Sequence, residues 1–253
     1  MLRRPVKSNR RKQQTARTVA LPAPWKGLNT RDRLEETDPG YATILENLIP
    51  GNAELQFRRG HVAHLTSLPD APVETLMECT TGGNRKLFAA VGTEIYDATT
   101  EDVGILAVSG LTNARWQHTM YATAGGQFLV CVNGADGVRA CNGTDWTDQS
   151  ISGVDPATLI GVTAHKARLW FVQDGTLKAF YLPPLAIAGE ASPLDLGPIA
   201  KKGGTLQAVS GWSVDAGDGA DDYLVFITSE GECMVYAGTD PNSEATWSLV
   251  GIY

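Results

Sequence analysis

A hairpin that recurs four times restricts the fold of this chain more than any other feature. Each copy has an apolar strand, a turn rich in Gly, Asp or Asn, and a second strand, and the first strands begin at Leu87, Phe128, Leu169 and Leu224. These starts are 41, 41 and 55 residues apart. Another apolar segment precedes each hairpin, at 75–79, 116–122, 159–164 and 206–211. A unit of about 40 residues with three or four strands is typical of a β-propeller blade.

We therefore predict an all-β fold, a β-propeller or open arc of about four blades with three or four strands each. A β-sandwich or barrel is the alternative, although Greek-key connections rarely give so regular an interval. The longer last interval is expected to hold a loop at residues 215–222. The spacing leaves three possibilities for closure: the N-terminal segment supplies a closing strand, the ring stays open, or further blades complete it.

Charge divides the chain into two parts. Of its 21 Lys and Arg residues, seven lie in residues 1–17, whereas all 28 Asp and Glu residues follow this stretch. Low hydrophobicity and like charges predict an extended arm, which we place at residues 1–21. Its basic side chains are suited to an acidic protein surface or to DNA phosphates, and a merely solvated tail is the alternative.

Residues 22–72 form a separate segment rich in turn signals, which we interpret as a docking segment. Asp38-Pro39-Gly40 and Pro50-Gly51-Asn52 are expected turns. Between them, residues 41–48 lack helix breakers and carry apolar residues at helical spacing, which predicts a short helix. Alternation over 54–58 predicts one strand. Residues 73–253 would then hold the repeated hairpins.

Several motifs resemble those of the nozzle or tubular tail proteins of short-tailed bacteriophages. In the docking segment they are Trp-Lys-Gly-Leu-Asn-Thr-Arg-Asp at 25–32, Leu-Glu-Asn-Leu-Ile-Pro at 45–50 and Arg-Arg-Gly at 58–60. Later stretches, at 212–219, 229–232 and 238–241, are also similar to that family.

The resemblance implies a virion structural protein that assembles in the host cytoplasm into a ring-shaped homo-oligomer, a hexamer, in the phage tail. It also implies contact with a tail adaptor or portal-proximal protein, around the path by which phage DNA leaves. The partner-binding residues expected on this basis are those of the arm and the docking segment: Arg3, Arg4, Lys7, Arg10, Arg11, Lys12, Arg17, Trp25, Leu28, Asn29, Arg31, Asn47, Arg58 and Arg59.

Catalytic motifs are missing from the sequence, which has no Gly-x-Ser-x-Gly, phosphate-binding loop or His-Glu-x-x-His. We therefore expect neither enzymatic activity nor a cofactor. The pair His61 and His64 is expected at a surface or interface rather than on a metal. A weak calcium candidate remains in the acidic stretch, for which a solvated loop is the alternative: Asp215, Asp218, Asp221 and Asp222.

Two other classes of function compete with the tail protein. A glycan-binding or glycan-cleaving propeller requires exposed aromatics and paired acids at one mouth of the ring, whereas blade cores are the alternative use of the five tryptophans in the repeats: Trp116, Trp146, Trp170, Trp212 and Trp247. A cytosolic scaffold propeller would be a monomer whose arm is dispensable.

The four cysteines have no zinc-type spacing, and each lies in or beside an apolar run, so we expect buried free thiols. A disulfide between Cys131 and Cys141 across their hairpin is the alternative. No apolar run reaches the roughly 18 residues of a membrane-spanning helix, and the stretch after the basic arm is too short for a signal-peptide core.

Overall fold

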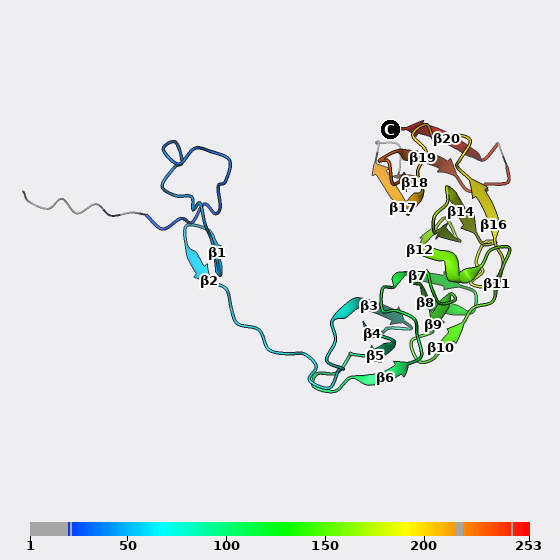
Figure 1. Ribbon diagram of the computed structural model, residues 1–253, viewed down its shortest axis with the longest axis horizontal. Coiled ribbons are helices and arrows are strands. Elements are labelled where there is room, and N and C mark those ends of the chain that lie inside the picture. The colour runs from blue at the N-terminus through cyan, green and yellow to red at the C-terminus, as the bar shows by residue number, and fades with distance from the viewer. Residues whose placement is uncertain (1–19, 21, 216–219, 244) are drawn as a thin grey trace, which may run out of the picture. The chain divides into compact units, whose positions relative to one another are not determined.

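The computed structural model describes residues 20, 22–215, 220–243 and 245–253, with the backbone alone for 214, 215, 220 and 221 (Figure 1). The chain divides into two compact units, residues 1–62 and 63–253, which we call the N-terminal unit and the sheet unit. No helix among the described residues is long and apolar enough to cross a membrane.

The sheet unit is built from four antiparallel sheets of four strands each, in which the strands follow chain order. The first sheet contains β3 (Val73–Thr81), β4 (Asn84–Val91), β5 (Glu94–Asp97) and β6 (Ile105–Val108). The second contains β7 (Gln117–Thr123), β8 (Gly126–Val132), β9 (Arg139–Cys141) and β10 (Trp146–Asp148). The third contains β12 (Leu159–His165), β13 (Arg168–Gln173), β14 (Lys178–Tyr181) and β16 (Ser192–Asp195). The fourth contains β17 (Leu206–Asp215), β18 (Ala220–Thr228), β19 (Cys233–Gly238) and β20 (Trp247–Ile252).

Short elements complete the unit. A parallel pair joins β11 (Ile151–Ser152) to β15 (Gly189–Glu190), and a 3-10 turn spans Pro156–Thr158. The sheets follow one another in a curved row within the unit (Figure 1). The first strands β3 and β12 pack against β7 and β8 of the second sheet, and β17 packs against β12 and β13 of the third. The all-β prediction is thus confirmed, with sheets of about four strands. The described part of the chain forms no closed propeller, since the first and fourth sheets do not pack extensively on each other.

Three hydrophobic cores lie between the four sheets, because strand residues point alternately to opposite faces. In β8, Leu129 and Cys131 enter the core shared with the first sheet, while Val130 and Val132 enter the core shared with the third. In β13, the alternate residues Trp170 and Val172 belong to the core shared with the fourth sheet. Middle strands buried on both faces explain the nearly unbroken apolar runs of the sequence.

The four hairpins lie where the repeat predicted them, but two other local predictions are wrong, the first of them in part. Of the loop expected at 215–222, the ends are paired strand: Asp215 pairs with Ala220 and Val214 with Asp221, while residues 216–219 lie outside the described residues. The helix expected at 41–48 does not form. Its eight residues are too few for a helix to be stable without packing, and the backbone of Ala42 instead bonds to Gly27 and Asn29.

The last residue of the stretch 41–48, Leu48, begins a strand instead. β1 (Leu48–Pro50) pairs with β2 (Leu55–Phe57), and β2 confirms the strand expected at 54–58.

All four cysteines are free, and three of them, Cys79, Cys131 and Cys141, are buried in the core between the first and second sheets. The alternative disulfide does not form, because the strand register places Cys131 opposite Arg139 and Cys141 opposite Leu129. Cys233 is half-buried.

Candidate functional site

The N-terminal unit folds its two turn motifs against each other around one lysine. Lys26 Nζ lies 5.8 Å from the ring centre of Trp25 and 5.6 Å from that of Tyr41, and 2.6 Å from Asp38 Oδ2. The hydrogen bond between Lys26 and Asp38 raises the pKa of the lysine and lowers the pKa of the carboxyl. Asp38 also accepts a hydrogen bond from the backbone N–H of Gly40. The Trp-Lys-Gly and Asp-Pro-Gly motifs are therefore one folded feature.

The two asparagines predicted to bind partners shape the turns of this unit. Asn29 Oδ1 accepts from the backbone N–H groups of Arg31 at 3.0 Å and Asp32 at 3.3 Å. Asn47 has a φ of 56°, a left-handed conformation that Asn tolerates better than most residues, and its carbonyl accepts from the N–H of Arg58 at 2.8 Å. Of the predicted partner-binding residues in this unit, Trp25, Leu28, Arg31, Asn47, Arg58 and Arg59 are exposed.

The N-terminal unit has no hydrophobic core among its described residues, in which only Gly27 and Gly40 are buried. Large apolar side chains lie at its surface instead; Phe57, for example, is 83% exposed. Others that are exposed are Leu28, Leu34, Ile44, Ile49 and Val62. Isolated two-stranded hairpins are marginally stable in water, so packing on another surface would stabilise such a unit.

Two groups of predicted site residues lie partly or wholly outside the described residues. The seven basic residues of the arm all lie outside the described residues, and so does Asp218, one of the four residues of the calcium candidate. Asp215 and Asp221 belong to paired strands, and Asp222 accepts a hydrogen bond from Ser213 Oγ. No three His, Cys, Asp or Glu side chains gather as a metal site in the part of the chain that is described. His64 shares a hydrogen bond with the carbonyl of Ala98.

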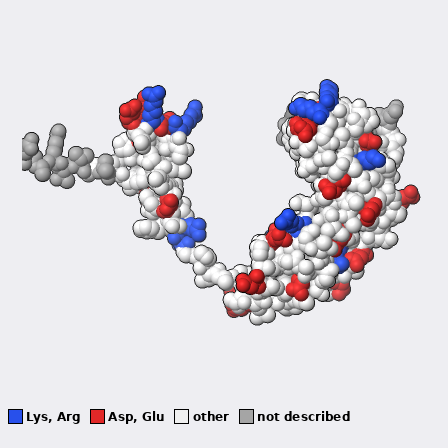
Figure 2. Space-filling model, in the orientation of Figure 1, with Lys and Arg blue, Asp and Glu red and all other residues white. Residues whose placement is uncertain are grey.

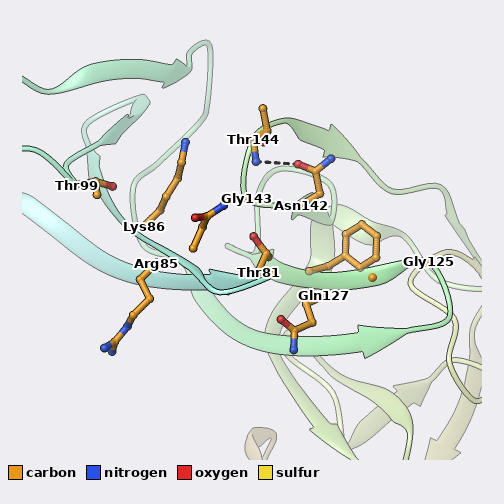
Figure 3. Close-up of a pocket in the computed structure, with 13 residues that line it drawn as sticks. Thr81, Arg85, Lys86, Thr99, Gly125, Gln127, Asn142, Gly143 and Thr144 are labelled. Carbon is orange, nitrogen blue, oxygen red and sulfur yellow. Dashed lines mark hydrogen bonds between the residues drawn. The ribbon is translucent and has the colours of Figure 1, made fainter.

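A polar cleft of about 550 Å³ lies between the hairpin turns of the first and second sheets (Figure 3). Its polar side chains largely bond within the protein: Asn142 Oδ1 accepts from the N–H of Thr144, Lys86 pairs with Asp97 at 3.0 Å, and Arg85 pairs with Glu78 at 2.7 Å. The residues that line the cleft include no Asp or Glu. This cleft therefore lacks the pair of carboxylic acids that a glycosidase needs.

The tryptophans of the repeats serve mainly the cores. Trp116 and Trp170 are buried, and Trp146 and Trp247 pack against cores while half-buried. Trp170 stacks on Trp247 with ring centres 5.4 Å apart. Of the five tryptophans weighed as glycan contacts, only Trp212 is exposed, at 53%.

A mainly apolar hollow covers the side of the fourth sheet that faces away from the third, which we call the outer face of the fourth sheet. Leu224 and Phe226 point into the core, so the residues that alternate with them, Val225 and Ile227, point outward. The hollow measures about 770 Å³ and has no charged residue in its lining: Ser210, Gly211, Trp212, Tyr223, Val225, Cys233, Val235, Val250 and Tyr253. Sequence reasoning missed this surface, although the run of apolar residues on both sides of β18 is a sign of it.

The surface of the sheet unit is mainly acidic, in contrast to the basic sequence of the arm. Asp and Glu side chains are scattered along its visible surface, with Lys and Arg at fewer places (Figure 2). This acidic body agrees with the distribution of charge in the sequence, in which every Asp and Glu follows the arm.

Comparison with known protein families and with curated proteins gave no match to this chain.

Proposed function

We propose that this protein is a structural component of a phage tail or head-to-tail connector, forming part of a ring around the DNA exit channel. The observation that carries the proposal is the N-terminal unit. It contains the motifs that resemble tail proteins, its turns are organised by those same residues, and its apolar side chains lie at the surface for want of a core. A unit of this kind is suited to docking on an adaptor or a neighbouring subunit.

In this proposal the four sheets are the blades of an open propeller arc. Their strands run in chain order, and each sheet packs face to face on the next through its own core. In such a stack each repeat is stabilised by its nearest neighbours. The function is mechanical rather than catalytic, and the protein acts without a cofactor.

The basic arm would contact an acidic surface of a neighbouring subunit or the DNA. The acidic sheet unit repels DNA, which suits the wall of a channel through which DNA must slide. Binding of a DNA duplex by the arm would weaken steeply with salt, with a slope of log K against log salt of roughly −0.9 for each phosphate neutralised.

The first test asks whether the protein is part of the particle. An antibody against the purified chain is used to probe phage particles purified by density gradient, and a band at constant ratio to the capsid protein is expected. Absence of the chain from intact particles would refute the proposal.

The second test measures the mass of the full chain by light scattering at moderate salt. Three proteins are compared: the natural chain, a chain without residues 1–17, and a chain of full length whose seven arm Lys and Arg residues are replaced by Gln. A discrete ring that depends on the arm is expected, and the Gln variant separates charge from length. A stable monomer indifferent to the arm would favour the scaffold or the glycan-binding propeller.

A further inference from the structure

The first and fourth sheets each have one face on which no other sheet of the described residues packs. The second and third sheets place alternate residues in two cores, whereas the fourth contributes to the core with the third sheet and the first contributes to the core with the second. On the outer face of the fourth sheet, Trp212 is 53% exposed and Val250 is 49% exposed.

The outer face of the first sheet carries an apolar stripe that crosses all four strands. The register places Leu76 beside Ala89, Ala89 beside Tyr96, and Tyr96 beside Leu106. Leu76 is 59% exposed, and Leu106 is exposed as well. Met77 and Phe88 point to the opposite side, into the core shared with the second sheet.

We propose that the outer face of the fourth sheet binds the outer face of the first sheet of a second copy of this chain. The repeat supplies the reason for this occupant. Each of the first three sheets packs on the following sheet through one face, and the equivalent face of the fourth sheet is open. Likewise, the second, third and fourth sheets pack on the preceding sheet through the opposite face, and that face is open on the first sheet. The hollow has no charged residue in its lining. The stripe exposes Leu76 and Leu106 beside the half-buried Tyr96, whose hydroxyl donates a hydrogen bond to Glu94 on the same face. A contact centred on the hollow and the stripe therefore buries mainly apolar side chains.

This contact joins two different surfaces, and such contacts form rings when the rotation between copies closes. The inference thus deepens the proposed function, on which it rests, by naming the surfaces through which the copies of the ring meet. A face of four strands about 4.8 Å apart and about six residues long has a projected area of roughly 400 Å². Two such faces fall slightly below the roughly 1,000 Å² of stable interfaces. A single contact is therefore weak, and ring closure holds each copy by two.

The test places a charge on each face separately, in Trp212→Asp and Leu76→Asp. Both positions are exposed in the single chain, so folding is retained, as circular dichroism and urea unfolding will verify. Leu185→Asp is the matched control, because Leu185 lies in the turn after β14, away from both faces, is as exposed as Trp212, and has a φ of 61° that suits Asp. Masses are measured by light scattering at about 1 and about 50 μM, concentrations that bracket a micromolar contact.

Each face variant alone is expected to stay monomeric at the higher concentration, with the dissociation constant raised about 100-fold or more by the buried carboxylate. The control is expected to assemble like the natural chain. An equimolar mixture of the two face variants should give a dimer and nothing larger, because one intact first-sheet face then meets one intact fourth-sheet face. Cys233, which lines the hollow, should react more slowly with a thiol reagent in that dimer.

Three outcomes would overturn the proposal. If Leu76→Asp still associates, the fourth-sheet faces pair with each other or with something else. If the mixture stays monomeric, the two faces do not meet. If the natural chain is monomeric at both concentrations yet present in purified particles, the contact is wrong while the proposed function stands.

Discussion

Replacing Phe226 with Ala tests whether the core between the third and fourth sheets holds the end sheet in place. Phe226 is fully buried, and its ring lies edge-on to Trp170 at 5.8 Å and to Tyr236 at 5.7 Å. Truncating a buried Phe costs about 3–5 kcal/mol, from lost burial and from the cavity that remains. Two lost aromatic contacts, worth about 0.5–1.5 kcal/mol each, favour the upper half of that range. We expect the free energy of unfolding to fall by about 4 kcal/mol.

The neighbouring residue provides the control. Ile227→Ala removes an apolar side chain from the same strand, but Ile227 points to the outer face and is 37% exposed. Its loss should be about 1 kcal/mol in the monomer. Both variants are unfolded in urea at about 1 μM, where assembly through the outer face is absent, and followed by tryptophan fluorescence, since Trp170 and Trp247 lie in the affected core. Similar losses in the two variants would refute the assignment of faces to β18.

Three further outcomes are expected. A Cβ at Gly238 would clash with the backbone carbonyl of Thr246, so Gly238→Ala should lower the free energy of unfolding, measured in urea, by over ~2 kcal/mol. Gly175 has open space around it, so Gly175→Ala should lower it by only about 1 kcal/mol. Equal losses in the two variants would contradict this prediction. Burial and the charge of Lys166 lower the pKa of His165, so the unfolded chain binds more protons than the folded chain, and stability falls as the pH drops through about 6.5 and below. The His165→Gln variant should therefore lose less stability than the natural chain between about pH 7.5 and pH 5.5. An identical loss in both proteins would exclude His165 as the cause. Because Cys233 is half-buried and the other three cysteines are buried, a thiol reagent should label Cys233 alone in the folded monomer and all four cysteines only in denaturant. Rapid labelling of a second cysteine in the folded chain would show that the core between the first and second sheets opens.

The hairpins were predictable because their causes are local. In the second repeat, Asn133 accepts hydrogen bonds from the N–H groups of Ala135 and Asp136, and Gly134 has a φ of 71°, so the turn is encoded within a few residues. In the first, Gly92 at 58° joins two strands of nearly continuous apolar sequence. These signals fix where chains reverse, and the strands on either side follow.

The fourth strand of three sheets was not predicted, because those strands lack such signals. β6 is largely exposed, β10 has three residues, and β16 contains Pro193, which a strand tolerates at the edge of a sheet. Each is defined by its pairing with the preceding strand, a contact that composition does not record. The turns of the N-terminal unit were predictable, but the helix at 41–48 was not a sound inference, since apolar spacing indicates a helix only where a partner surface buries the apolar face.

The outer face of the fourth sheet shows the limit of sequence reasoning most clearly. In β13 and in β18 apolar residues follow one another without interruption, so both strands read as buried on two sides. In β13 both sets of alternate residues enter cores, whereas in β18 only Leu224 and Phe226 do. The apolar pattern thus predicts that both faces of a strand are buried, but it does not predict which surface covers the second face. The outer face of the fourth sheet packs on no other sheet of the described residues, and an apolar face of this size marks an interaction surface.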